Sequence, residues 1–141
     1  MEPVDLRELP EHALLLLDTA PIIYFLQSNP RFAPRFKSLF DRHAAGEFRF
    51  AVTTITIAEV LTGPLQAGDE PLARRYRAVL ESWQCVELDV GIAESAARLR
   101  ASLHLKLPDA VQAASALAIN AAALVTHDRD FSRVRPLRVI C

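Results

Sequence analysis

Five acidic residues are placed where they could do chemistry together. Asp18 directly follows an apolar run, Glu59 lies early in a helix expected after a second run, and Asp109 opens a later helical stretch. Asp128 and Asp130 follow another apolar run near the end of the sequence. Oxygen ligands of this kind suit Mg²⁺, which bridges one or two carboxylates to a substrate phosphate. The chemistry predicted from these residues is metal-assisted cleavage of a phosphodiester.

A group of neighbouring carboxylates has an energetic cost that a cation removes. At an effective dielectric of about 20, two close carboxylates repel each other by roughly 4 kcal/mol. A bound cation cancels this repulsion, lowers the pKa of an attacking water and neutralises the charge that builds on the phosphodiester. A buried acidic cluster in this chain would therefore indicate a metal site.

Each acidic residue, taken alone, is also typical of ordinary structure. Asp18 fits a turn or cap after a strand, and Glu59 completes the capping-box pattern Thr56-Ile-Ala-Glu59. Asp109 follows Pro108 in a first helical turn, where the helix dipole favours an acidic residue. The last two acids lie in a polar turn, where Asp is common. The functional interpretation depends on their shared placement.

Apolar periodicity divides the sequence into alternating strands and helices. Short apolar runs predict strands over 13–17, 50–54, 85–88, 123–126 and 137–140. Apolar residues at helical spacing predict helices after Thr19 and over about 30–46, 56–61, 72–80, 92–103 and 108–120. We expect Thr19 to cap the first helix and Gly63-Pro64 to end the third.

Strands that alternate with helices predict a mostly parallel sheet of four or five strands with helices on both faces. This is a three-layer α/β/α sandwich, in which ligands bind beyond the carboxyl ends of the strands. Residues 1–12 are polar with two prolines and are interpreted as an N-terminal arm, and residues 13–141 as a single domain. The helix opened by Pro108 is apolar nearly all round, so we expect it to be central.

Composition excludes several classes of protein. The chain has 141 residues, which is too short for two ordinary domains, and 51% of them are hydrophobic, which suits a single core. Cys85 and Cys141 are too far apart in sequence to indicate a disulfide framework or a paired zinc motif. The early apolar run 13–17 is too short to cross a membrane, so we expect a soluble, cytoplasmic protein. A net charge of −1 offers no global electrostatic argument for nucleic-acid binding.

Four segments resemble the four acidic motifs of PIN domains, in the same order and at similar spacing. These segments are Leu17-Asp18-Thr19-Ala20, Ile57-Ala58-Glu59-Val60, Leu107-Pro108-Asp109-Ala110-Val111-Gln112-Ala113-Ala114 and Val125-Thr126-His127-Asp128-Arg129-Asp130-Phe131. The resemblance covers about residues 13–140, and the third and fourth motifs carry most of its specificity. Small single-domain proteins that resemble this chain are mostly VapC toxins of type II toxin–antitoxin systems.

The resemblance implies an activity, partners and site residues. It implies an α/β/α endoribonuclease that depends on Mg²⁺ or Mn²⁺ and cuts structured RNA such as tRNA or rRNA. It also implies a homodimer and a cognate VapB-like antitoxin. The implied catalytic residues are Asp18, Glu59, Asp109 and Asp128, and the implied metal ligands are Asp18, Asp109, Asp128 and Asp130.

Residues around the fourth motif are assigned supporting roles. Thr126 is interpreted as a hydrogen-bond partner of a neighbouring carboxylate or of a water on the metal, although ordinary β-propensity explains it equally well. Arg129 and Arg133 are candidate RNA-binding residues, since arginines pair with phosphates. His127 is expected to be exposed on the turn.

The sequence departs from the PIN pattern or leaves it open at two points. Family members commonly carry Asn two places after the first Asp, where this chain has Ala20. Either Asp128 or Asp130 aligns with the fourth acid, and we prefer Asp128. Apolar residues at 22–26 and 32–40 are expected in the core, with part of that surface open to an antitoxin or a second subunit.

Other functions fit a small α/β chain with Asp at a strand end. A haloacid-dehalogenase-type phosphatase needs a second Asp two residues after the first, where Ala20 lies. A response-regulator receiver needs a late Lys after a strand, whereas Lys106 is the last lysine and precedes a helix. The remaining alternative is a non-catalytic PIN-like module that binds RNA or protein.

Overall fold

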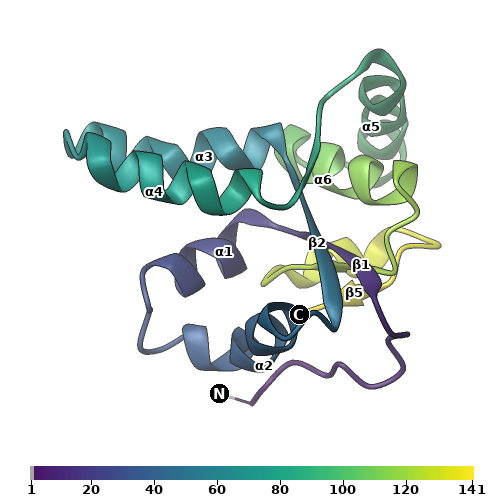
Figure 1. Ribbon diagram of the computed structural model, residues 1–141. Coiled ribbons are helices and arrows are strands. Elements are labelled where there is room, and N and C mark those ends of the chain that lie inside the picture. Colours follow the sequence, from purple (N-terminus) through teal and green to yellow (C-terminus); the bar gives the residue numbers. More distant parts are fainter. Residues whose placement is uncertain (1) are drawn as a thin grey trace.

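The computed structural model describes residues 2–141, and its elements confirm the predicted alternation of strands and helices (Figure 1). The strands are β1 (Ala13–Leu17), β2 (Phe48–Thr53), β3 (Gln84–Val86), β4 (Ala123–Val125) and β5 (Val139–Ile140). The helices are α1 (Thr19–Leu26), α2 (Ala33–Ala44), α3 (Thr54–Gln66), α4 (Glu70–Glu81), α5 (Val90–Leu103), α6 (Leu107–Ala118) and the short 3₁₀ helix η1 (Arg129–Arg133).

The five strands form one parallel sheet in the order β3-β2-β1-β4-β5. β1 lies in the middle, where Leu15 pairs with Phe50 of β2 on one side and with Ala123 of β4 on the other. The chain proceeds outward from β1 to β3 and then returns to β4 beside β1. In a parallel α/β sheet, this reversal opens a crevice beyond the carboxyl ends of the strands, and ligands bind there.

Side chains of β1 alternate between two cores, one on each face of the sheet. Leu15 and Leu17 pack with residues of α1, α2, α3 and α4, whereas Leu16 packs with α5, α6 and η1. Both faces of β1 are therefore buried, which explains its continuous apolar run. The three-layer α/β/α sandwich is confirmed. Residues 110–116 of α6 are all buried, so this helix is central, as expected.

The helices α3 and α4 form a hairpin that projects from the sheet (Figure 1). α3 runs from Thr54 to Gln66 with Pro64 inside it, so the helix stop predicted at Gly63-Pro64 is wrong. Proline removes one intrahelical hydrogen bond. Pro64 is buried, and α3 packs against α4.

The N-terminal arm packs against the domain although it contains no helix or strand within residues 2–12. Val4 and Leu6 are buried in the same core as Leu15, and the Val4 amide donates to the Arg35 carbonyl across 3.0 Å. The interpretation of residues 1–12 as a polar arm therefore overlooks two buried apolar residues, Val4 and Leu6. No helix within residues 2–141 combines the length and the apolar character that a bilayer crossing requires.

Candidate active site

Asp18 lies where the crevice is expected, directly after β1. Its carboxylate is the N-cap of α1, because Oδ1 accepts a hydrogen bond from the Thr19 amide across 2.9 Å. The cap predicted at Thr19 is therefore displaced by one residue. An acidic N-cap gains from the exposed amides and the dipole at the start of a helix, and this holds Asp18 at the edge of the sheet.

Two further donors from distant elements fix the Asp18 carboxylate. The Gln112 side-chain amide of α6 donates to Oδ1 across 3.0 Å, and the Thr126 hydroxyl after β4 donates to Oδ2 across 2.7 Å. The position of Thr126 thus fits the predicted role of partner to a carboxylate. Three donors from separate parts of the chain therefore fix the orientation of the Asp18 carboxylate.

Glu59 reaches the same region from α3. Its Oε1 accepts a hydrogen bond from the Thr19 hydroxyl across 3.1 Å, and that hydroxyl also lies 2.9 Å from the Thr56 hydroxyl. The predicted capping box is wrong, because the N-cap of α3 is Thr53, which accepts from the Thr56 amide. Glu59 lies in the second helical turn, so its carboxylate is free for contacts outside its own helix.

The pKa of Asp109 is affected by burial and by the charges of the other acids. The pKa of its half-buried carboxyl is raised first by burial, then by the charges of Asp18 and Asp128 and, to a smaller extent, of Glu59. Lys106 acts in the opposite direction. These carboxylates come from the N-cap of α1, from α3, from α6 and from the turn after β4, yet each of the other three is close enough to Asp109 to raise its pKa. The fold thus gathers the acids at one edge of the sheet.

Asp128 and Asp130 occupy different positions in the turn after β4. The Asp128 amide donates to the Thr126 hydroxyl across 3.0 Å, and the Asp128 carboxylate caps η1 by accepting from the Asp130 amide across 2.9 Å. Asp130 is exposed in η1. Only Asp128 of the two contributes to the raised pKa of Asp109.

The donor set fits a hard divalent cation. Within residues 2–141 no three acidic, histidine or cysteine side chains are gathered as tightly as in a formed metal centre. Oxygen ligands with surplus negative charge are the type that Mg²⁺ and Mn²⁺ select.

The basic residues predicted near the site differ in their contacts. Arg133 donates to the carbonyls of Leu103 and Asp130 across 3.1 and 3.3 Å, so it ties η1 to the end of α5. Arg129 is exposed and lines a cavity of about 390 Å³ together with Arg35 and His127. Arg129 is therefore better placed than Arg133 for contact with a phosphate.

The prediction that His127 is exposed on the turn is wrong. His127 is half-buried against Tyr24 of α1 and Phe32, the N-cap residue of α2, with ring centroids 5.5 and 5.1 Å away. It therefore packs the turn that carries Asp128 against the first two helices.

Gln112 and Thr53 were not singled out in the sequence, although both belong to the site. Gln112 is 1% exposed and bonds Asp18, Thr56 and Thr53, the last across 2.8 Å. The available signal was a long polar side chain inside an otherwise apolar helix. A buried polar group needs partners, and here those partners are the residues around the acids.

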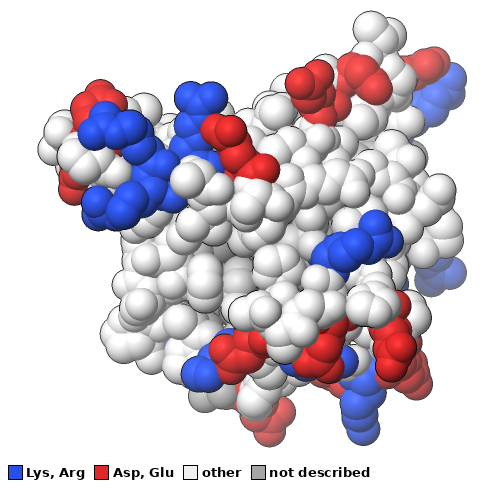
Figure 2. Space-filling view, viewed as in Figure 1, with Lys and Arg blue, Asp and Glu red and all other residues white. Residues whose placement is uncertain are grey.

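The surface charge gives no simple guide to a binding partner. Figure 2 shows acidic and basic residues mixed around the periphery of one face, with a broad uncharged area in its middle. This face carries no continuous basic stripe, in keeping with the net charge of −1. The local arrangement of the acids is therefore more informative than the overall charge.

The comparisons with known proteins agree with this geometry. A family model described as the PIN domain matches residues 15–136. No curated protein sequence matches the chain. The chain is similar to a protein in a toxin–antitoxin complex from Klebsiella pneumoniae, with 27% identity over 87% of this chain and 94% of that chain, and a TM-score of 0.69.

Two structures from Mycobacterium tuberculosis are also similar. One is from VapBC-5, a member of the VapBC family of toxin–antitoxin systems, with 26% identity over 90% of this chain and 95% of that chain, and a TM-score of 0.57. The other is VapC20, described as a toxin that cleaves the sarcin–ricin loop, with 18% identity over 86% and 99% of the two chains and a TM-score of 0.62. At 18% identity, the likeness to VapC20 shows the fold alone. From the family match over residues 15–136 together with the acidic edge of the sheet, the chain belongs to the PIN domain family.

Proposed function

We propose that this protein is a Mg²⁺-dependent endoribonuclease and the toxin of a VapBC-type toxin–antitoxin pair. The observation that carries the proposal is the hydrogen-bonded arrangement that joins the acids: Thr19 donates to both Asp18 and Glu59, and Thr126 bonds both Asp18 and the Asp128 amide. The pKa of Asp109 is raised first by burial and then by the charges of Asp18, Asp128 and Glu59. Acids that serve only as caps have no reason to converge from four separate elements on one edge of a sheet. Asp18, Asp109 and Asp128 would hold the cation, with Asp130 at its margin, and Mn²⁺ would substitute for Mg²⁺.

The cation would supply two effects when bound: a lower pKa for the attacking water and neutralisation of the phosphate charge. The protein contributes the orientation of its ligands. Thr126 holds Asp18 through its hydroxyl proton and Asp128 through its hydroxyl oxygen. Glu59 is exposed at the mouth of the site, where its carboxylate can orient a water.

The proposed reaction is hydrolysis of the bond between phosphorus and the 3′ oxygen. The water oxygen forms a bond to phosphorus, the 3′ oxygen leaves, and the proton released by the water ends on that oxygen. The products are a 5′-phosphate and a 3′-hydroxyl. Arg129 is proposed to contact a neighbouring phosphate of the RNA, and a structured RNA such as tRNA or rRNA is the proposed substrate. VapC20, which shares the fold, is described as a toxin that cleaves the sarcin–ricin loop.

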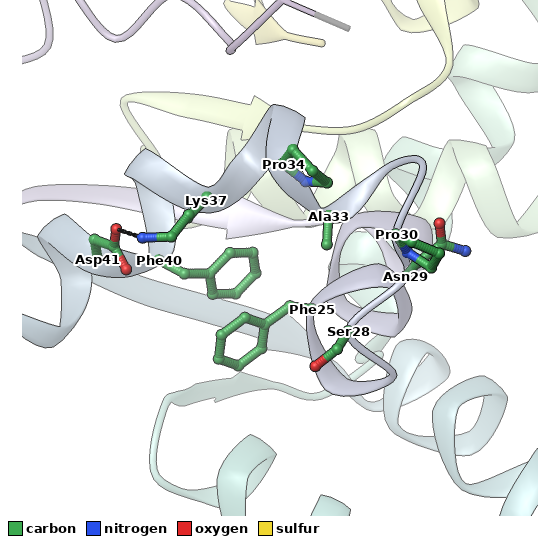
Figure 3. Close-up of a pocket in the computed structure, with 9 residues that line it drawn as sticks. All are labelled: Phe25, Ser28, Asn29, Pro30, Ala33, Pro34, Lys37, Phe40 and Asp41. Carbon is green, nitrogen blue, oxygen red and sulfur yellow. Dashed lines mark hydrogen bonds and ion pairs between the residues drawn. The ribbon is translucent and has the colours of Figure 1, made fainter.

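The proposed partner is a VapB-like antitoxin, because the similar proteins from Klebsiella pneumoniae and of VapBC-5 come from toxin–antitoxin systems. An apolar surface between α1 and α2 suits a protein partner (Figure 3). Phe25 is 43% exposed and stacks on Phe40 with ring centroids 4.1 Å apart, beside a cavity of about 340 Å³. The Lys37–Asp41 ion pair lies at its rim. We propose that apolar side chains of the antitoxin pack against Phe25 at this cavity.

RNA cleavage with and without a divalent cation tests the proposed activity. We expect purified protein to cut RNA in Mg²⁺ or Mn²⁺ and to be silent in EDTA, and Asp18→Asn to lose most cleavage and most stabilisation by added Mg²⁺. Asn caps helices as well as Asp does but offers no acceptor to the Thr126 hydroxyl, so without metal Asp18→Asn should melt close to wild type, because relief of charge repulsion offsets the lost hydrogen bond. Asp69→Asn is the matched control, because Asp69 is also an N-cap: it caps α4 by accepting from the Leu72 amide.

Two results would contradict the proposed activity. Full cleavage in EDTA would exclude the metal, and the absence of both cleavage and Mg²⁺ stabilisation would favour the non-catalytic binding module. The partner is tested separately by co-expression with a small neighbouring gene. We expect a stable, nuclease-silent complex that Phe25→Asp weakens. Val90→Asp, at a position 87% exposed on α5, should leave the complex intact.

A further inference from the structure

Gln112 is a buried polar residue with three side-chain hydrogen-bond partners, and no step of the proposed reaction uses it. Its side chain is 1% exposed within an otherwise apolar helix, and each polar atom of its amide has a side-chain partner from another element. Burying an amide costs free energy unless it is fully hydrogen-bonded. The full set of partners around Gln112 therefore points to a role in ordering them.

The direction of each hydrogen bond is fixed by the chemistry of the partners. A carboxylate only accepts, so Nε2 must be the atom that faces Asp18, at 3.0 Å from Oδ1. The second Nε2 hydrogen goes to the Thr56 hydroxyl oxygen across 2.6 Å, and Oε1 accepts from the Thr53 hydroxyl across 2.8 Å. The amide is thus held in one orientation.

This arrangement continues to the second acid of the site. The Thr56 oxygen accepts from Gln112, which leaves the Thr56 proton to donate to the Thr19 oxygen 2.9 Å away. The Thr19 proton then donates to Oε1 of Glu59 across 3.1 Å. A one-way chain of donors therefore runs from the Gln112 amide to Glu59, while the other Gln112 hydrogen holds Asp18.

Gln112 also determines which oxygen of Asp18 remains available. Oδ1 accepts two hydrogen bonds, from the Thr19 amide and from Gln112, whereas Oδ2 accepts one, from Thr126. Each carboxylate oxygen has two lone pairs, so the open position on Asp18 lies on Oδ2. Loss of the Gln112 donor would open a second position, on Oδ1, and would leave the carboxylate held only by the Thr19 amide and the Thr126 hydroxyl.

We propose that Gln112 is a positioning residue of the active site: its amide presents Oδ2 of Asp18 to the cation and, through Thr56 and Thr19, orients Glu59. This inference rests on the proposed function. Hydrogen-bond partners of metal ligands typically contribute about 10- to 100-fold to metal affinity or activity. Gln112→Met keeps the length of the side chain without its hydrogen bonds.

The test measures Mn²⁺ affinity by calorimetry alongside RNA cleavage. We expect Gln112→Met to weaken Mn²⁺ binding by about 10- to 100-fold. In an Asp18→Asn background the same substitution should add little, because residues that act through one contact are not additive. A folded Gln112→Met variant with wild-type Mn²⁺ affinity would overturn the inference while leaving the proposed function intact. A wild-type protein that neither binds Mn²⁺ nor cuts RNA would overturn both.

A matched pair at Thr56 tests the branch that reaches Glu59 and does not depend on the Gln112→Met variant folding. Thr56→Val keeps the shape and removes the hydroxyl, whereas Thr56→Ser keeps the hydroxyl. We expect Thr56→Val to lower the rate of cleavage at saturating Mn²⁺ with a smaller change in Mn²⁺ affinity, and Thr56→Ser to remain near wild type. Equal cleavage rates in the two variants would overturn the role of Gln112 toward Glu59.

Discussion

Tyr24 of α1 and His127 after β4 are 103 residues apart in sequence, yet the Tyr24 hydroxyl lies 2.9 Å from Nδ1 of His127. The imidazole also lies edge-on to the rings of Phe32 and Phe36, at 5.1 and 6.0 Å between centroids. Because His127 directly precedes Asp128, this contact anchors the turn that carries the fourth acid.

Removal of the Tyr24 hydroxyl should therefore affect both stability and activity. Tyr24→Phe keeps the ring packing but leaves Nδ1 of His127 without its partner, so we expect the free energy of unfolding to fall by about 0.5–1.5 kcal/mol. Urea denaturation measures this change, and RNA cleavage should also decrease as Asp128 loses its support. Tyr76→Phe, on α4, is the control, and an equal loss in both variants would argue against a specific role for the contact.

Asp109 gives the metal-free protein a distinctive pH dependence. Its folded-state pKa is raised, first by burial and then by Asp18 and Asp128, so the folded state binds its proton more tightly than the unfolded state does. As pH rises from about 4, the ordinary aspartate pKa, through the raised value, Asp109 makes an increasingly unfavourable contribution to stability.

Substitution of Asp109 by Asn should remove this contribution. We expect Asp109→Asn to melt higher than wild type at neutral pH without metal, and the difference to shrink as pH falls below the raised pKa. Melting temperatures of the two proteins, measured from about pH 3 to about pH 8, check the sign of this difference. With Mg²⁺ added, wild type should gain more stability than the variant. A variant that melts lower at every pH would show that Asp109 is a structural cap.

The sequence was sufficient where the controlling interactions are local. Strand β1 was predicted with its observed bounds because a strand buried on both faces must be apolar throughout, and Asp18 marks where that run ends. The starts of helices were less predictable. Thr19, Thr53 and Thr56 are all chemically suitable caps, and only the backbone geometry selects Asp18 and Thr53.

The contacts that could not be predicted join residues far apart in the chain. Gln112 is 94 residues from Asp18 and 56 from Thr56, and periodicity within α6 says only that this position is buried. The burial of His127 likewise depends on aromatic residues of α1 and α2. Local patterns locate the acids, whereas the side chains that orient them emerge only from packing of the layers.

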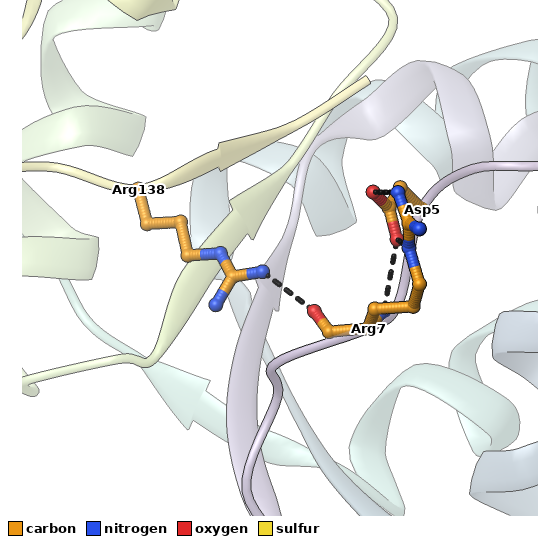
Figure 4. A network of polar contacts seen from close by, with 3 residues as sticks. All are labelled: Asp5, Arg7 and Arg138. Atoms are coloured by element: carbon orange, nitrogen blue, oxygen red, sulfur yellow. Dashed lines mark hydrogen bonds and ion pairs between the residues drawn. The ribbon is translucent and has the colours of Figure 1, made fainter.

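The N-terminal arm should contribute to stability rather than behave as a free tail. Arg138 donates to the carbonyls of Arg7 and Glu8, and Asp5 pairs with Arg7, which lowers the pKa of Asp5 to about 2 (Figure 4). Leu6 is 8% exposed. We expect Leu6→Ala to lower the free energy of unfolding by about 2 kcal/mol, as in other cores. Glu11→Ala, in an exposed part of the arm, should change it little, and equal effects would argue that the arm is detached in solution.

Asp128 and Asp130 should differ in their importance to the site. The pKa of Asp109 is raised by burial, by the charge of Asp18 and then by the charge of Asp128. The Asp128 amide donates to the Thr126 hydroxyl, which itself donates to Asp18. Asp130 is exposed, and its amide rather than its carboxylate contacts Asp128. In Asp128→Asn the new side chain can still cap η1 through its oxygen, and position 130 is exposed. Neither Asp128→Asn nor Asp130→Asn should therefore unfold the protein.

We therefore expect Asp128→Asn to lose most RNA cleavage and most stabilisation by Mg²⁺, and Asp130→Asn to retain a large part of both. Cleavage of a generic RNA and melting temperature with and without Mg²⁺ check this for the two variants side by side. Since ligand-linked stability follows RT ln(1 + [L]/Kd), a tenfold weaker Kd removes about 1.4 kcal/mol of Mg²⁺ stabilisation at saturation. A larger loss in Asp130→Asn than in Asp128→Asn would assign the fourth acid to Asp130, and would require the turn after β4 to rearrange when the cation binds.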